Sequence, residues 1–314
     1  MTPSRRDFLA VGVGAFAVAT VPWAVLRRST RTVRRRVPVM GTIAEIAVVS
    51  RDEGHAQVAI DAAIARLQFV DATMSRFRAD SEIGRANASG EAAISSETAA
   101  VLTASLEWAQ RSEGAFDPCL GRVSELWNFA ASSAPPAGYA RFAGLGLYRH
   151  LDFDGRRVRI SDRAVGIDLG GIAKGHGVDL AVQVLREAGV TDAFVNVGGD
   201  LYAMGVSEDG DPWRVGVRDP DDPTGIVAEV TVTDGAVATS GDYVRAFEHG
   251  GHRYHHLLDP RTAAPSATQR RSLTVTAPTC LDADAAATAL FSLDAPASRS
   301  LLFSAPDLHV AHSV

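Results

Sequence analysis

The chain has 314 residues, of which 46% are hydrophobic and 22% are charged, so it can bury an ordinary core and is neither a disordered tail nor a multi-span membrane protein. Its net charge is −6, but 8 of its 31 basic residues and 1 of its 37 acidic residues lie within the first 36 positions. The remainder is therefore strongly acidic, which argues against a nucleic-acid-binding protein.

The first 28 residues have the pattern of an export segment. Arg5 and Arg6 precede an apolar run over 11–26, an order that resembles a twin-arginine signal. The run is at the short end of the roughly 17–25 residues that cross a bilayer. Residues 17–19, Ala-Val-Ala, are a weak cleavage pattern, so removal of the segment and its retention as an anchor both stay open.

The rest of the chain is interpreted as a basic linker over 29–36 followed by one folded domain over 37–314. Hydrophobic periodicity and turn residues predict its elements. Strands are expected over 42–49, 193–197, 213–217 and 226–232, and helices over 57–73, 97–111, 175–188 and 283–293. Because these elements mix without a regular β-α-β period, the pattern favours an α+β fold with mixed sheets flanked by helices over a doubly wound sheet.

A glycine-rich turn over 166–176 precedes the predicted helix at 175–188 and includes Lys174. Such a turn exposes backbone N–H groups at a helix N-terminus, where phosphate binds well. The run is neither a Walker loop nor a dinucleotide fingerprint, so a tight packing turn is an equal interpretation. Lys174 is the one lysine among 31 basic residues, which indicates a site that needs a compact ammonium group.

Asp284 and Thr288 are four residues apart in the last predicted helix and therefore lie on one face. Their oxygens, with alanines between them, suit a hard cation such as Mg²⁺. From the residues alone, an ordinary acidic residue near a helix start and a packed threonine explain the pattern as well.

A histidine pair, His255-His256, precedes Leu257 and an Asp259-Pro260 turn. A histidine beside an acid suits proton transfer, although such a pair is more often structural. Zinc is also conceivable, but neither an HExxH motif nor a Cys/His spacing supports it.

The order of short motifs along the chain is more specific than any one of them. The motifs are Met40-Gly41-Thr42, Met74-Ser75-Arg76-Phe77, Gly114-Ala115-Phe116-Asp117-Pro118, the turn over 166–176, Asn196-Val197-Gly198-Gly199-Asp200, Ala238-Thr239-Ser240-Gly241-Asp242-Tyr243, the run over 255–262, and Asp284 with Thr288. From Val37 onward the chain resembles the ApbE-type FAD:protein FMN transferase family. That resemblance implies an ApbE-like, T-fold-like architecture with FAD in a central cleft.

The resemblance also implies site residues, an activity and partners. FAD-binding positions would be Met40, Phe77, Ala115, Phe116, Asp117, Asp168, Lys174, His176 and Leu257; magnesium ligands Ala173, Asp284 and Thr288; and the base His256. The family commonly has tyrosine at positions 77 and 176, and glycine where this chain has Ala263. The implied reaction is Mg²⁺-dependent transfer of FMN from FAD to a Thr or Ser hydroxyl of an acceptor flavoprotein, with release of AMP.

Two alternatives to the transferase stay open at this point. Water in place of the acceptor hydroxyl would make the chain an FAD pyrophosphatase, and loss of catalysis would make it an envelope flavin-binding protein. The export pattern predicts a periplasmic location or the outer face of the cytoplasmic membrane, with membrane anchoring if the N-terminal segment is retained.

Overall fold

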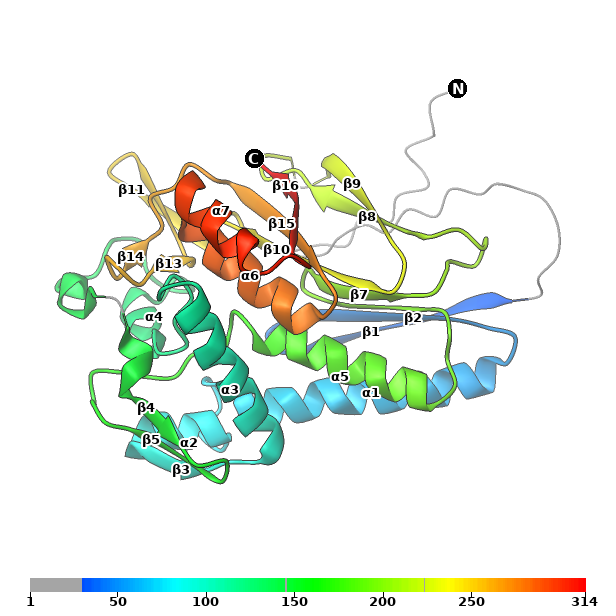
Figure 1. Ribbon diagram of the computed structural model, residues 1–314, viewed down its shortest axis with the longest axis horizontal. Coiled ribbons are helices and arrows are strands. Elements are labelled where there is room, and N and C mark those ends of the chain that lie inside the picture. The colour runs from blue at the N-terminus through cyan, green and yellow to red at the C-terminus, as the bar shows by residue number, and fades with distance from the viewer. Residues whose placement is uncertain (1–29, 145, 223) are drawn as a thin grey trace.

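The computed structural model describes residues 30–144, 146–222 and 224–314, which build a large antiparallel sheet with cover on both faces (Figure 1). The predicted export segment over 1–28 lies outside the described residues. Within the described ranges no helix has the length and apolar character needed to cross a membrane.

The central sheet contains seven strands in the order β1-β2-β6-β7-β10-β15-β16, and every neighbouring pair is antiparallel. The strands are β1 (Arg31–Val39), β2 (Thr42–Ser50), β6 (Ala193–Val197), β7 (Asp200–Met204), β10 (Gly235–Gly241), β15 (Ser272–Ala277) and β16 (His309–Ser313). Antiparallel pairing with separate helices is typical of an α+β protein and confirms the predicted fold class.

The first strand corrects the predicted domain boundary. Residues 31–36 were expected to be a linker, but they lie in β1 and pair with β2. The Arg34 and Arg36 guanidinium groups lie 3.3 and 2.9 Å from the buried Glu45 carboxylate on β2. The arginine run therefore neutralises a buried acid at the sheet edge, so the folded part begins near Arg31.

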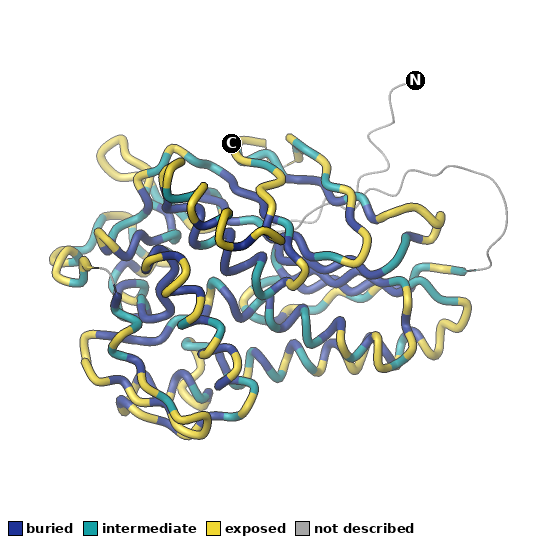
Figure 2. The backbone as a smooth tube through the Cα atoms, in the orientation of Figure 1, coloured by how far each residue is buried: buried dark blue, intermediate teal, exposed yellow. Residues whose placement is uncertain are grey.

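Three helices cover one face of the sheet: α1 (Glu53–Met74), α5 (Ala173–Glu187) and α6 (Cys280–Ser292). The predicted helices 57–73, 175–188 and 283–293 are confirmed in them. Apolar residues of these helices belong to the main core, and in Figure 2 buried, dark stretches of chain recur along the helices and run through the central strands. The Asp179 carboxylate on α5 accepts the N–H groups of Cys280 and Leu281 at 2.8 and 2.9 Å and so caps the start of α6.

The opposite face of the sheet is covered by the hairpin of β8 (Trp213–Arg218) and β9 (Ile226–Val232). Trp213 packs against Phe194 of β6 with 5.6 Å between ring centroids. Both strands of this hairpin match the predicted runs. Because both sides of the sheet are covered, every residue of the central strands β6 and β7 is buried.

The remaining elements lie around one end of the sheet (Figure 1). The helices are α2 (Glu82–Ser89), α3 (Ser96–Arg111, the predicted helix 97–111), α4 (Gly121–Trp127) and α7 (Ala295–Phe303), with 3-10 turns at Tyr139–Phe142 and Leu147–His150. The strands are β3 (Glu91–Ala93), β4 (Leu151–Phe153), β5 (Arg157–Ile160), β11 (Ala246–His249), β12 (His252–His255), β13 (Leu258–Asp259) and β14 (Ala264–Pro265). The β11–β12 hairpin packs Phe247 and Tyr254 on Trp127 of α4.

Candidate active site

The glycine-rich turn brings the start of α5 into close contact with α6. A Cβ at Gly171 would lie 2.8 Å from Thr288 Oγ1, and one at Gly175 would lie 2.2 Å from the Cys280 carbonyl oxygen. A Cβ at Gly175 would therefore clash with fixed backbone, and one at Gly171 would force Thr288 to move. The glycines therefore allow the approach that sets Asp284 and Thr288 beside the turn.

Lys174 lies between two buried carboxylates at this junction. Its ammonium group forms ion pairs with Asp200, at the start of β7, and with Asp284, whose Oδ1 and Oδ2 are 3.3 and 3.4 Å away. Asp284 Oδ2 also accepts the Gly175 N–H at 3.1 Å. Three elements, α5, α6 and β7, thus place one ammonium group and two carboxylates together.

This cluster has two carboxyl groups for one ammonium group. Burial raises the pKa of Asp284 and Asp200 above the usual range, and for Asp200 the neighbouring Asp284 carboxylate raises it further. Burial alone would lower the pKa of Lys174, but the two carboxylates outweigh it and hold that pKa above its ordinary value. Because two carboxyl groups share one ammonium group, a second cation bound here would stabilise their ionised forms.

The predicted magnesium ligands meet at the same junction. Thr288 follows Asp284 by one helical turn and faces Gly171, and Ala173 is the first residue of α5. A carboxylate, a hydroxyl and a carbonyl oxygen are the ligands that a hard cation prefers. No group of three or more His, Cys, Asp or Glu side chains in the described ranges is arranged to hold a metal ion, so a soft-metal site such as the zinc alternative finds no support there.

Met40 and His176 contact the same helix start. Met40 lies in the β1–β2 turn with a φ of 53°, and its Sδ is 3.2 Å from where a Cβ would lie at Gly177. His176, which precedes Gly177, has a buried Nε2 with no hydrogen-bond partner in the described part of the chain. Burial, and then the Arg66 guanidinium group, lower the pKa of His176 to about 4, so its ring is neutral at pH 7.

Asp168 and Phe77 are linked through Arg76. Asp168 Oδ2 lies 2.9 Å from Arg76 Nε, while its Oδ1 accepts the Gly170 N–H at 3.0 Å. The Arg76 guanidinium carbon lies 4.1 Å from the centre of the Phe77 ring, which is 72% exposed. A large exposed aromatic side chain beside a partly buried ion pair is a candidate stacking surface.

The Ala115-Phe116-Asp117 segment is buried. Phe116 is 3% exposed and belongs to the core, so its ring is not free to stack on a ligand. Asp117 accepts the N–H groups of Cys119 and Tyr148 at 2.9 and 3.2 Å, and burial raises its pKa to about 6. The segment adjoins the glycine turn because the Asp168 N–H donates to the Pro118 carbonyl at 2.8 Å.

The two histidines at the end of β12 have different surroundings. His255 is buried, its Nε2 lies 3.2 Å from the Ser266 carbonyl oxygen, and its ring meets Phe291 edge-on at 5.7 Å. His256 is partly exposed and its buried Nδ1 has no hydrogen-bond partner among the described residues. Burial first, and then the Arg245 guanidinium group, lower the pKa of His256 to about 3, and Lys174 contributes in the same direction.

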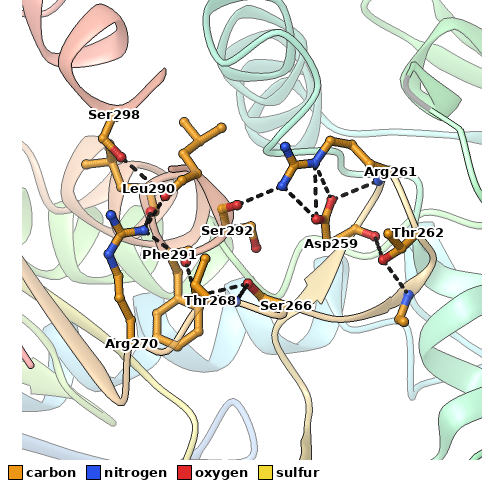
Figure 3. A network of polar contacts seen from close by, with 12 residues as sticks. Asp259, Arg261, Thr262, Ser266, Thr268, Arg270, Leu290, Phe291, Ser292 and Ser298 are labelled. Atoms are coloured by element: carbon orange, nitrogen blue, oxygen red, sulfur yellow. Dashed lines mark hydrogen bonds and ion pairs between the residues drawn. The ribbon is translucent and has the colours of Figure 1, made fainter. Parts of the chain in front are cut away.

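Polar contacts anchor the loop after this pair to α6 (Figure 3). Arg261 donates to Asp259 at 2.7–3.1 Å and to the Ser292 carbonyl at 2.9 Å. Ala263, where the family usually has glycine, adopts a φ of 55° and accepts the Trp127 Nε1 hydrogen at 2.8 Å. The turn therefore keeps a left-handed conformation without glycine. Leu257, before the turn, packs against the main core.

Most of the predicted residues lie at the start of α5 or contact a residue that lies there. Sequence reasoning missed Asp200, Arg76 and Arg245. The signal for Asp200 was its place at the end of the Asn196–Asp200 motif, and that for Arg76 was its place in the Met74–Phe77 motif. Nothing in the sequence showed that Arg245 lies next to His256, since their contact depends on hairpin pairing.

Comparisons with known proteins identify the family of the chain. The model of a family described as the ApbE family matches residues 40–311. A Vibrio cholerae protein named FAD:protein FMN transferase is 33% identical over 267 residues, covering 81% of this chain and 79% of its own length. A Treponema pallidum protein of the same name is 33% identical over 300 residues, covering 88% and 83%.

Solved structures give the same result. The crystal structure of the ApbE protein from Thermotoga maritima superposes with a TM-score of 0.79 at 31% identity, covering 89% of this chain and 94% of that one. The flavin transferase ApbE from Vibrio cholerae superposes with a TM-score of 0.78 at 31% identity, covering 90% and 93%.

Proposed function

The chain belongs to the ApbE family, and from that premise we propose that it is an FAD:protein FMN transferase. It joins the FMN phosphate of FAD to a Thr or Ser hydroxyl of an acceptor flavoprotein. A P–O bond to the acceptor oxygen forms, the P–O bond to AMP breaks, and the hydroxyl proton leaves. The observation that carries this proposal is the charged cluster of Lys174, Asp200 and Asp284 at the start of α5, close to a neutral histidine.

His256 is the proposed base. Its lowered pKa means that the ring is unprotonated at neutral pH and can accept the hydroxyl proton. Its Nδ1 is buried, so proton transfer would use the other ring nitrogen. Lys174, held by two carboxylates, would place positive charge near the phosphate oxygens as charge develops on them.

The FAD-binding role of the remaining predicted residues is supported by their contacts. Met40 and His176 meet at α5, and Phe77 reaches Asp168 through Arg76. The start of α5 presents backbone N–H groups, which suit a pyrophosphate. Because Ala115, Phe116 and Asp117 are buried, they would contribute through their backbone or by shaping the cleft, and Leu257 would contribute an apolar contact.

Magnesium is proposed as the metal, held by Asp284, Thr288 and the Ala173 carbonyl. When bound, it would neutralise pyrophosphate charge. Asp284→Ala should abolish turnover but leave much of the FAD affinity, whereas Thr288→Ala should be milder because water can replace a neutral ligand. Calorimetric titration of Mg²⁺ into FAD-loaded protein reads the ion without activity. Undiminished Mg²⁺ binding by Asp284→Ala would overturn the assignment.

The function itself is tested by mass spectrometry. The protein, FAD and Mg²⁺ are incubated with a candidate acceptor that has one modifiable threonine, and an acceptor in which that threonine is valine is the control. An added FMN mass on the first acceptor alone is the expected result. Release of FMN and AMP at the same rate with either acceptor, and no adduct, would identify a pyrophosphatase; FAD binding without any product would identify a flavin carrier.

Export is proposed from the paired arginines and the apolar run in the first 28 residues. The enzyme would then act in the periplasm or at the outer face of the cytoplasmic membrane, either released or anchored. Fractionation of cells that produce the full chain tests this, and recovery in the cytoplasm alone would contradict it.

A further inference from the structure

Arg245 lies directly opposite His256 at the base of the β11–β12 hairpin. The hairpin pairs Ala246 with His255, and the His256 N–H continues the ladder by donating to the Arg245 carbonyl at 3.1 Å. Directly opposed residues in an antiparallel pair project to the same face, and alternate residues to opposite faces. The side chains of Arg245 and His256 therefore share one face, while His255 and Arg253 share the other.

The Arg245 guanidinium group also reaches the β1–β2 turn. Its Nη2 lies 3.7 Å from where a Cβ would lie at Gly41, the residue after Met40. Arg245 thus lies between a proposed FAD-binding turn and the proposed base, on a different element from Lys174. Its position depends on two separate contacts, one to the hairpin and one to the turn.

The charge of Arg245 is not compensated. Lys174 has two carboxylate partners, but Arg245 is exposed and forms no ion pair or side-chain hydrogen bond within the described ranges. Its guanidinium group is nevertheless close enough to lower the pKa of His256. An exposed cation beside a neutral histidine, without an ion-pair partner among the described residues, is suited to a ligand that brings negative charge.

We propose that Arg245 binds the FMN-side phosphate of FAD and holds it beside His256. This inference rests on the proposed function, in which that phosphate is the group transferred. The planar guanidinium fork can contact two non-bridging oxygens at once, which fixes the phosphorus relative to the base. Binding of the phosphate also offsets the positive charge around His256, so the base becomes stronger when substrate is present.

The test is the binding of flavins without any acceptor. Arg245→Gln should weaken both FAD and FMN by about 10- to 100-fold, the range for a lost charge-assisted hydrogen bond, and should leave riboflavin unaffected because it has no phosphate. Arg245→Lys should recover part of the loss. Calorimetry gives the affinities, and a thermal melt verifies that the exposed substitution leaves the fold intact.

Arg253→Gln is the matched control, because it removes the same charge from the opposite face of the same hairpin. It should bind FAD as the wild type does. Wild-type FAD and FMN affinity in Arg245→Gln overturns the proposal, and so does a raised acceptor KM with unchanged FAD affinity, which would assign Arg245 to acceptor docking. Weaker FAD binding by Arg245→Gln supports it even if the wild type transfers no FMN, in which case the proposed function alone fails.

Discussion

At the scale of single residues, the neighbouring side chains of His255 and His256 have different surroundings, because consecutive residues of an extended chain point to opposite sides. His255 contacts Phe291 and the Ser266 carbonyl, and is part of the packing between the hairpin and α6. His256 shares its face with Arg245 and is close enough to Lys174 for that charge to lower its pKa. This arrangement leaves His256, and not His255, on the side of Arg245 and Lys174.

The role of His256 gives the most direct residue-scale prediction. His256→Ala should reduce FMN transfer by about two to four orders of magnitude, the range for a positioned general base, while FAD binding and Mg²⁺ dependence persist. His255→Ala should lower stability by opening a cavity beside Phe291 but should change the transfer rate of folded protein much less. In-gel flavin fluorescence of the acceptor measures both, with the folded fraction of each variant determined first.

The pH dependence follows from the lowered pKa of His256. A base must be neutral to act, so a pKa of about 3 in the free protein places the acid limb of kcat/KM well below the ordinary value of about 6.5. Protonation of His256 should thus not limit activity at pH 5; a loss of activity above that pH would come from the raised pKa of Asp284 and Asp200, and Arg245→Gln should shift the His256 limb to higher pH. Equal loss of transfer in the two histidine variants, or full transfer by His256→Ala, would refute the base assignment.

At the scale of elements, the site depends on how closely α5 and α6 approach. Gly171 and Gly175 allow the contact between the two helices. Asp179 of α5 stabilises it by accepting the first N–H groups of α6. Asp284 and Thr288, the proposed metal ligands on α6, then lie beside the turn before α5. Two helices joined by a cap keep Asp284 and Thr288 in fixed positions relative to Lys174.

Gly175→Ala tests the importance of this approach. The added Cβ would meet the backbone of Cys280, which cannot rotate away, so the free energy of unfolding should fall by about 1–3 kcal/mol or more. Gly54→Ala in the first turn of α1 is the control: its Cβ has ordinary contacts, and the change should stabilise by up to about 1 kcal/mol. Urea denaturation measures both, and an unchanged midpoint for Gly175→Ala would contradict the packing argument.

At the scale of the whole molecule, β1 closes one edge of the seven-stranded sheet and carries the turn that holds Met40. Its arginines neutralise Glu45, whose side chain is only 9% exposed. The described fold therefore includes residues that composition alone assigned to a linker.

Two truncations separate these interpretations. Removal of residues 1–29 should leave the thermal midpoint unchanged, because the strand and its ion pairs remain. Removal of residues 1–36 should destabilise the protein by about 3 kcal/mol or more, since Glu45 stays buried without its partners and most of an edge strand is lost. Circular dichroism melts compare the two, and identical midpoints would restore the linker interpretation.

The sequence by itself determined the local elements and the family. Periodicity predicted β2, α1, α3 and α6 because helical and strand burial repeat over short distances along the chain. The mixture of predicted strands and helices gave the α+β class, and motif order gave the family and the candidate residues, since each motif is contiguous. The arginine run was misread because its partner, Glu45, lies on a different strand.

The tertiary structure alone decided which charges meet. Asp200 joins Lys174 and Asp284 across 26 and 84 positions of sequence, and nothing local indicates that pairing. Arg245 and His256 are opposed only because a two-residue turn sets the register of their hairpin. Phe116 is buried and Phe77 is exposed although both are aromatic residues in family motifs. Burial and charge pairing depend on contacts between distant segments, and those contacts exist only once the chain has folded.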